Sequence, residues 1–393
     1  MSNLYKYLLL FCIFCNFFSD SVLKWLGWWE RDTTLLYDFV PDSFFVEAEK
    51  ELVYVFLVLI IISFYRKGNG RGDFSVSQYQ NEFYRNSFFN FLVWFVFVFF
   101  VAYVFSKINW SFSTEFRGVG QFKLANRQKL LTGMCYNFYL PFLLYLYLIG
   151  FFKKNKWFFF SLAMAVFILN GVASGGRHKL ISSMLFGVLF VTYLEKINKK
   201  TLIFASIVAI VALSFTATDR FNVNRSFWAD NIVKVLQSNS SSVFLPVVKY
   251  SIDQGYILTP SNFGMHFVSV FMPSFIYINV FHMISYTRSS FLYNSLYNTN
   301  PNSGLGFMML ADFYWCFKYW GYVLYVLVYF FVLNFFRKYI FSDKPVLVVM
   351  SIYIIYRFCD QRADFGAFVK PVVYTFVFLS FLEFFRLKAL KAK

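Results

Sequence analysis

The chain has 393 residues, of which 59% are apolar, 24% are Phe, Tyr or Trp, and only 15% are charged. Soluble domains carry about 25% charged residues, and disordered or collagen-like chains need a polar or Gly/Pro-dominated composition, so these classes are excluded. The formal charge of +17 is typical of membrane proteins, which concentrate Lys and Arg in cytoplasmic loops. The composition therefore predicts an all-α integral membrane protein, with no nucleic-acid partner.

Apolar stretches near the roughly 20 residues of a membrane-spanning helix predict about ten spans. They cover residues 4–18, 52–65, 88–105, 131–152, 157–172, 180–194, 202–216, 319–336, 345–356 and 371–385. Several are short, so their helices must extend into flanking residues. No small-residue cleavage site follows the first stretch, which predicts that it is a retained span.

Basic residues predict the sidedness of these spans. Placing both termini in the cytoplasm puts six short basic segments inside, whereas the opposite orientation puts the acidic segment 30–51 inside. The excess of Lys and Arg in cytoplasmic loops therefore predicts that the N-terminus and the C-terminus both face the cytoplasm. Most of the arginines then face outward, which favours an anionic substrate, because Arg binds phosphate and carboxylate bidentately.

A loop of about a hundred residues between spans seven and eight is predicted to lie outside. The expected domains are seven spans in 1–216, the external loop in 217–318, and three spans with a basic tail in 319–393. The loop contains apolar segments, 243–256 and 263–284, broken by Pro246, Pro260 and Pro273. They are predicted to form helices at the membrane interface, and a full crossing by one of them is the alternative.

A Gly-rich turn, residues 174–179 (SGGRHK), stands between spans five and six. Its glycines expose backbone N–H groups at the start of a helix, and Arg177, His178 and Lys179 follow, so that the turn forms a candidate anion site. The alternative is a short hairpin whose basic residues meet lipid headgroups.

A single carboxylate, Asp312, lies among apolar residues just before span eight. A charge at the membrane surface is costly without a partner, and such residues are commonly functional. Two structural roles are the alternatives: pairing with Lys318, or capping a helix.

These two stretches resemble bacterial O-antigen polymerases of the Wzy type. The resemblance rests on the turn with Arg177, the long external loop, and the run Ala311-Asp312-Phe313-Tyr314 continued through Phe317 to Gly321. That family often has Glu where this chain has Asp312, and glycine where it has Lys318. The two motifs directly cover about 30 residues.

The resemblance implies a metal-independent membrane glycosyltransferase without a cofactor, which joins oligosaccharide repeat units carried on undecaprenyl diphosphate at the external face of the inner membrane. The lipid-linked donor and acceptor are the implied partners, with membrane lipid, and a chain-length regulator is a candidate. Arginine stabilises a diphosphate leaving group without titrating, and a carboxylate orients the acceptor hydroxyl. Asp312, Arg177 and His178 are the candidate catalytic residues. The candidate diphosphate-binding residues are Arg177, Arg220, Arg225, Arg288 and Arg117.

Two other activities remain open. An O-antigen ligase, which moves finished chains onto the lipid A core, uses the same donor. A flippase for the lipid-linked oligosaccharide belongs to another class; it favours charges inside spans and repeated halves, whereas here the charges gather at span ends.

Overall fold

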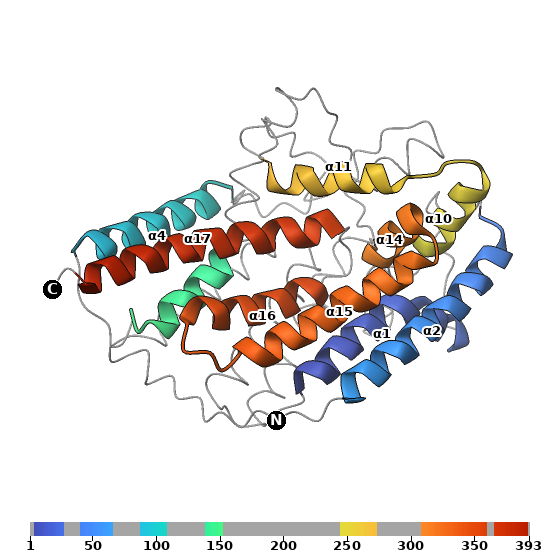
Figure 1. Ribbon diagram of the computed structural model, residues 1–393, viewed down its shortest axis with the longest axis horizontal. Coiled ribbons are helices and arrows are strands. Elements are labelled where there is room, and N and C mark those ends of the chain that lie inside the picture. Colours follow the sequence, from blue (N-terminus) through green and yellow to red (C-terminus); the bar gives the residue numbers. More distant parts are fainter. Residues whose placement is uncertain are drawn as a thin grey trace, which may run out of the picture. The chain divides into compact units, whose positions relative to one another are not determined.

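The computed structural model describes residues 4–26, 40–65, 87–107, 138–151, 244–272, 308–359 and 365–391. Within these ranges the regular secondary structure is entirely helical (Figure 1). The all-α expectation is thus confirmed for the described part of the chain.

Helices occupy seven of the expected spans. They are α1 (Leu4–Trp25), α2 (Asp42–Tyr65), α4 (Ser87–Lys107), Phe138–Leu148, α15 (Trp320–Tyr339), α16 (Pro345–Cys359) and α17 (Phe365–Lys391). Most extend beyond the apolar stretch, as expected; α2 begins ten residues early and includes the end of the acidic segment. The expected spans 157–172, 180–194 and 202–216 lie outside the described residues.

Two of the described helices, α15 and the stretch Phe368–Lys388 of α17, are long and apolar enough to cross a membrane, with 20 and 21 residues. Shorter apolar helices are Tyr5–Phe18, Phe138–Leu148 and Pro345–Cys359. These helices are compatible with a helical membrane protein, and the number of ten spans stays a prediction.

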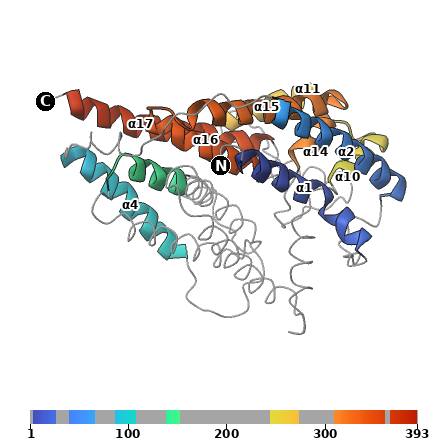
Figure 2. The ribbon, with the colours of Figure 1, turned by 90° about the horizontal axis from the view of Figure 1, so that it is seen from below.

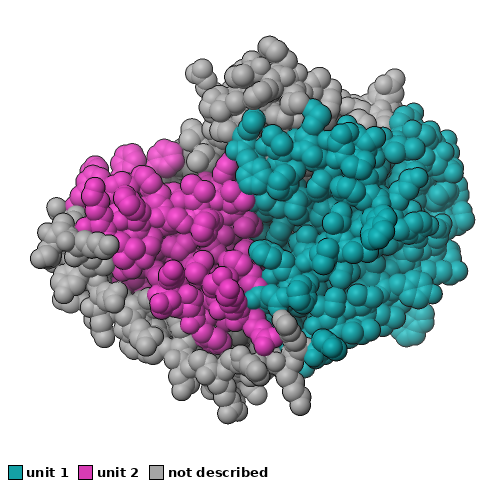
Figure 3. All heavy atoms as spheres, viewed as in Figure 1, with its two compact units in different colours: residues 1–69, 217–334, 357–370 teal, residues 70–216, 335–356, 371–393 magenta. Residues whose placement is uncertain are grey.

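The chain divides into two compact units (Figure 3). The first comprises residues 1–69, 217–334 and 357–370, and the second comprises 70–216, 335–356 and 371–393. Each unit therefore joins segments that are far apart in the sequence. The expected division into 1–216, 217–318 and 319–393 stays a prediction.

In the first unit, α1 packs against α2. Leu9, Ile13 and Phe17 are fully buried on one face of α1, because residues four apart point the same way on a helix. The ring of Phe17 lies 6.1 Å from that of Tyr325 on α15. A hydrogen bond between the hydroxyls of Ser63 and Tyr329 joins α2 to α15 in this buried region.

Three short helices of the first unit belong to the predicted external loop: α10 (Phe244–Asp253), α11 (Pro260–Phe271) and α14 (Met309–Phe317). They have 10, 12 and 9 residues. At about 1.5 Å per residue none of them spans the roughly 30 Å of a bilayer core. Neither α10 nor α11 is long enough to cross a bilayer by itself, and the alternative of a full crossing by the segment 263–284 stays open because residues 273–284 lie outside the described part of the chain.

Local sequence explains where α10 ends and α11 begins. Gly255 has a positive φ of 86°, and the Tyr256 N–H bonds back to the Ser251 carbonyl at 2.9 Å, which closes α10 with a Schellman motif. Thr259 caps α11 through a capping box with Asn262, and Pro260 occupies the first turn. These stop and start signals turn the chain sharply between two apolar segments.

In the second unit, aromatic side chains pack α17 against its neighbours. Phe88 of α4 lies 5.9 Å from Phe385, and Phe138 lies 5.3 Å from Phe378, between ring centroids. Figure 1 shows α4 beside α17, and Figure 2 shows one end of α4 near the C-terminal part of α17 while its other end runs away from it. Near the end of α17, Glu383 accepts hydrogen bonds at 2.7 Å from Tyr145 and from Arg386.

Candidate functional site

Asp312 is the sequence-predicted site residue that the described structure includes. The other candidates lie outside the described residues, so their places stay predictions. They are Arg117, Arg177, His178, Arg220, Arg225 and Arg288.

Asp312 lies in the first turn of α14 and is fully buried. Its Oδ2 accepts a hydrogen bond of 3.2 Å from the backbone N–H of Phe365, the first residue of α17. A carboxylate at this place satisfies an N–H that has no partner inside the helix and faces the positive end of the helix dipole. This contact is the helix-capping role that the sequence left open, and it leaves the catalytic role untested.

Lys318, the other suggested partner of Asp312, is exposed and makes no ion pair with Asp312 within the described residues. It ends α14 with a positive φ of 50° and ψ of −131°, a conformation that favours glycine. The chain turns there into α15, and the Gly321 N–H bonds to the Lys318 carbonyl at 2.8 Å. Glycine at position 318 would relieve this strain, and the polymerase family that the chain resembles often has glycine there.

Gly321 brings α15 into direct contact with the backbone of α14. A Cβ placed on it would lie 2.5 Å from the Phe313 carbonyl oxygen and 2.6 Å from the Tyr314 nitrogen, with the Phe313 carbonyl carbon closer still. No side chain fits there without a shift of one helix. The corner between α14 and α15 therefore depends on this glycine.

Aromatic side chains of α14 pack against α11 and the start of α17. Phe313 lies 5.1 Å from Phe365 and 5.7 Å from Phe263 of α11, between ring centroids. Trp315, which is buried, donates its indole N–H to the Tyr256 carbonyl at 2.9 Å. Asp312 is thus held at a dry junction of α11, α14 and α17.

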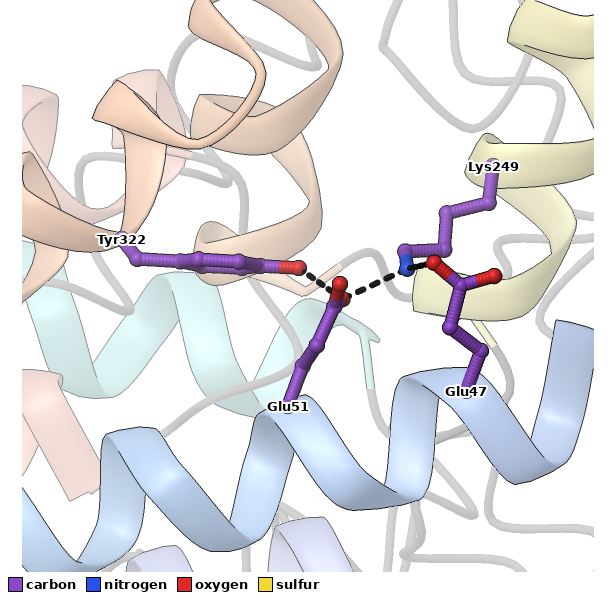
Figure 4. Close-up of polar contacts among 4 residues, drawn as sticks. All are labelled: Glu47, Glu51, Lys249 and Tyr322. Atoms are coloured by element: carbon purple, nitrogen blue, oxygen red, sulfur yellow. Dashed lines mark hydrogen bonds and ion pairs between the residues drawn. The ribbon is translucent and has the colours of Figure 1, made fainter.

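A second polar group lies beside Tyr314. Lys249 of α10 is bound to Glu47 at 2.8 Å and to Glu51 at 2.7 Å, and Glu51 also accepts a hydrogen bond from the Tyr322 hydroxyl. Figure 4 shows both glutamates pointing from α2 toward the ammonium group, with Tyr322 of α15 approaching Glu51. We call Glu47, Glu51, Lys249 and Tyr322 the Lys249 cluster.

Tyr314 connects α14 to this cluster. Its ring stacks on that of Tyr322 at 5.2 Å, and the Lys249 ammonium lies 5.4 Å from its ring centroid, within cation–π range. Burial, followed by the negative charge of Glu51, raises the pKa of the Tyr314 phenol above its ordinary value. The phenol therefore stays protonated and can donate a hydrogen bond.

The Lys249 cluster has one formally positive and two formally negative side chains, with a net formal charge of −1. The Lys249 side chain is 4% exposed, that of Glu51 16% and that of Glu47 54%. Two carboxylates compensate the cost of burying the ammonium group. An ammonium surrounded in this way is not available to a phosphate, whereas the carboxylates can still accept hydrogen bonds from hydroxyl groups.

The sequence itself contains a signal for this cluster. Glu47 and Glu51 are four residues apart and share one face of α2. Lys249 interrupts an apolar run, which is itself a sign of a buried and paired charge. The pattern does not indicate that Glu47 and Lys249, which are 202 residues apart, lie in contact.

Within the described residues, no group of three or more His, Cys, Asp or Glu side chains could hold a metal ion. Comparisons with protein-family models, curated proteins and solved structures give no match.

Proposed function

We propose that this chain is an O-antigen polymerase, an integral-membrane glycosyltransferase with ten spans and both termini in the cytoplasm. It acts at the external face of the inner membrane on oligosaccharide repeat units linked to undecaprenyl diphosphate. The bond between the sugar and the diphosphate of the growing chain breaks, and a new glycosidic bond forms with a hydroxyl of the incoming unit. Undecaprenyl diphosphate leaves, and the hydroxyl proton passes to a base.

The observation that carries the proposal is the buried carboxylate of Asp312 in the short helix before α15, which is long and apolar enough to cross a membrane. A carboxylate in a dry site is a suitable base or orienting group for an acceptor hydroxyl. The adjoining corner at Lys318 and Gly321 has the geometry that suits the glycines of the resembling family. In the proposed site, Arg177, with Arg220, Arg225, Arg288 and Arg117, binds the diphosphate.

The contacts of the Lys249 cluster support the proposed sidedness. Glu51 precedes the second predicted span, and Lys249 belongs to the loop between spans seven and eight. Their charged groups are 2.7 Å apart, which agrees with a topology that has both segments on the same side of the bilayer. The predicted topology requires this, because it places both segments outside.

The test uses purified protein given only synthetic lipid-diphosphate repeat units, with product length measured on a gel. A polymerase makes chains longer than one unit, a ligase makes none without lipid A core, and a flippase moves the units across vesicles without forming a bond. Failure of the wild-type protein to elongate the units would contradict the proposal.

Two substitutions test the residue roles. Asp312→Asn keeps an oxygen for the Phe365 N–H but removes the base, so we expect normal folding and elongation about a hundredfold or more slower. Arg177→Ala should abolish long chains while single lipid-linked units accumulate. Wild-type elongation in Asp312→Asn would leave this residue with the capping role alone.

A further inference from the structure

We propose that the Lys249 cluster, together with the exposed ring of Tyr319, binds the acceptor sugar through its hydroxyl groups and does not bind the diphosphate. The inference rests on the proposed function and adds a binding site to it. Three properties of the cluster carry it: its charge, its unused acceptor atoms and the aromatic ring beside it.

The net charge of −1 decides which part of a lipid-linked substrate the cluster can meet. Two carboxylates lie within 2.8 Å of the only cation of the cluster, and that cation is almost fully buried. A diphosphate placed beside them would be repelled, since like charges in a partly buried site are destabilising. Neutral hydroxyl groups are donors and meet no such penalty.

Within the described residues, each glutamate has one oxygen that makes no hydrogen bond and could accept one from a ligand. Lys249 uses Oε1 of Glu47 and Oε2 of Glu51, and Tyr322 also bonds to Oε2 of Glu51. Glu47 Oε2 and Glu51 Oε1 have no hydrogen-bond partner in the described structure. Because the Glu47 side chain is 54% exposed, a ligand hydroxyl can reach it from solvent.

Tyr319 supplies an apolar face for a sugar ring. It is 62% exposed and stands edge-on to Tyr314 at 5.9 Å between ring centroids. Tyr314 in turn lies next to Lys249 and Tyr322. Carboxylates beside an exposed aromatic ring combine a polar and an apolar surface, as a sugar does, with hydroxyls at its edge and C–H groups on its face.

The first experiment measures elongation kinetics. The donor is a lipid-diphosphate chain whose terminal hydroxyls are methylated, so that it cannot accept, and the concentration of unmodified single units is varied. Glu47→Gln should raise the KM for the acceptor about tenfold, the scale of one weakened hydrogen bond to a charged group, with donor KM unchanged. Tyr319→Leu should also raise the acceptor KM about tenfold, because it removes the aromatic face on which the sugar ring stacks, and should leave donor KM unchanged. Asp253→Asn, an exposed acid at the end of α10, is the matched control and should leave both values unchanged.

The second experiment measures binding of the acceptor sugar in the absence of the reaction. The repeat-unit oligosaccharide, released by mild acid and treated with phosphatase, is titrated onto purified protein by calorimetry. Wild type and Asp253→Asn should bind it, and Glu47→Gln should bind about tenfold more weakly. Inorganic pyrophosphate serves as the anionic probe, and its affinity should not fall in Glu47→Gln.

The outcomes separate the two proposals. An acceptor KM in Glu47→Gln and Tyr319→Leu that stays at the wild-type value, in protein that elongates, overturns the acceptor site and leaves the polymerase intact. A wild-type protein that binds the oligosaccharide through Glu47 but never elongates overturns the polymerase and retains the sugar site. A raised donor KM, or weaker pyrophosphate binding in Glu47→Gln, assigns the cluster to the diphosphate and refutes the inference.

Discussion

Replacing Gly321 by alanine tests whether α15 really rests on the backbone of α14. The added Cβ would meet backbone atoms of Phe313 and Tyr314 at 2.5–2.6 Å and nearer, whereas ordinary contacts are 3.4 Å or more. The helices must therefore separate by about 1 Å, and overpacking of this kind costs about 1–3 kcal/mol. We expect a net loss near 2 kcal/mol, because alanine returns part of the cost through its helix propensity.

Two other glycines are matched controls for this substitution. Gly264 lies inside α11 with no atom within 4 Å of a built Cβ, so Gly264→Ala should stabilise the protein by about 0.5–1 kcal/mol. Gly255 also has open space but a φ of 86°, so Gly255→Ala should cost about 1 kcal/mol through the backbone alone.

The assay is the free energy of unfolding, obtained by titrating SDS into detergent-solubilised protein and following tryptophan fluorescence. The expected order of stability is Gly264→Ala, wild type, Gly255→Ala and Gly321→Ala. A Gly321→Ala protein as stable as wild type would refute the close approach of α14 and α15. Equal losses at Gly321 and Gly264 would show that the effect is not steric.

Three further predictions concern other parts of the first unit and use the same measurement. Lys318→Gly should stabilise the protein by about 0.5–1 kcal/mol by relieving the positive φ of 50°, whereas Lys318→Ala should give no gain. Lys249→Met should destabilise the protein by about 3 kcal/mol, since it leaves the Glu51 carboxylate buried without its cation. Adding Glu51→Gln to Lys249→Met should restore part of this loss, and additive losses in the double variant would contradict the pairing. Asp312→Ala should cost about 1 kcal/mol as a lost cap while Asp312→Asn costs little, and equal losses in both would show that the hydrogen bond to Phe365 is unimportant.

The helices could be predicted from the sequence because each arises from local information. Apolar runs of nearly bilayer length predicted the positions of α15 and α17, and Pro260 marked the break before α11. The ends of the helices could not be predicted from apolar runs alone, since α2 begins with polar residues that continue the same helix.

The partners of the polar residues could not be predicted in the same way. Asp312 bonds to Phe365, 53 residues later, and Lys249 meets Glu47, 202 residues earlier. Such contacts depend on how helices pack, and periodicity within one helix contains no information about its neighbours. The sidedness predicted from the basic loops reduces the number of possible partners for Lys249, because it places both Lys249 and Glu47 outside.

The long separation of these partners has a consequence for biosynthesis. A ribosome adds about 5–20 residues per second. Lys249, 202 residues after Glu47, is therefore synthesised about 10–40 s later, and the interval between Glu51 and Tyr322, 271 residues apart, is longer. During this interval the acidic end of α2 has to stay hydrated at the lipid–water boundary. The early part of the nascent protein thus acquires its final neighbours only after most of the polypeptide has been made.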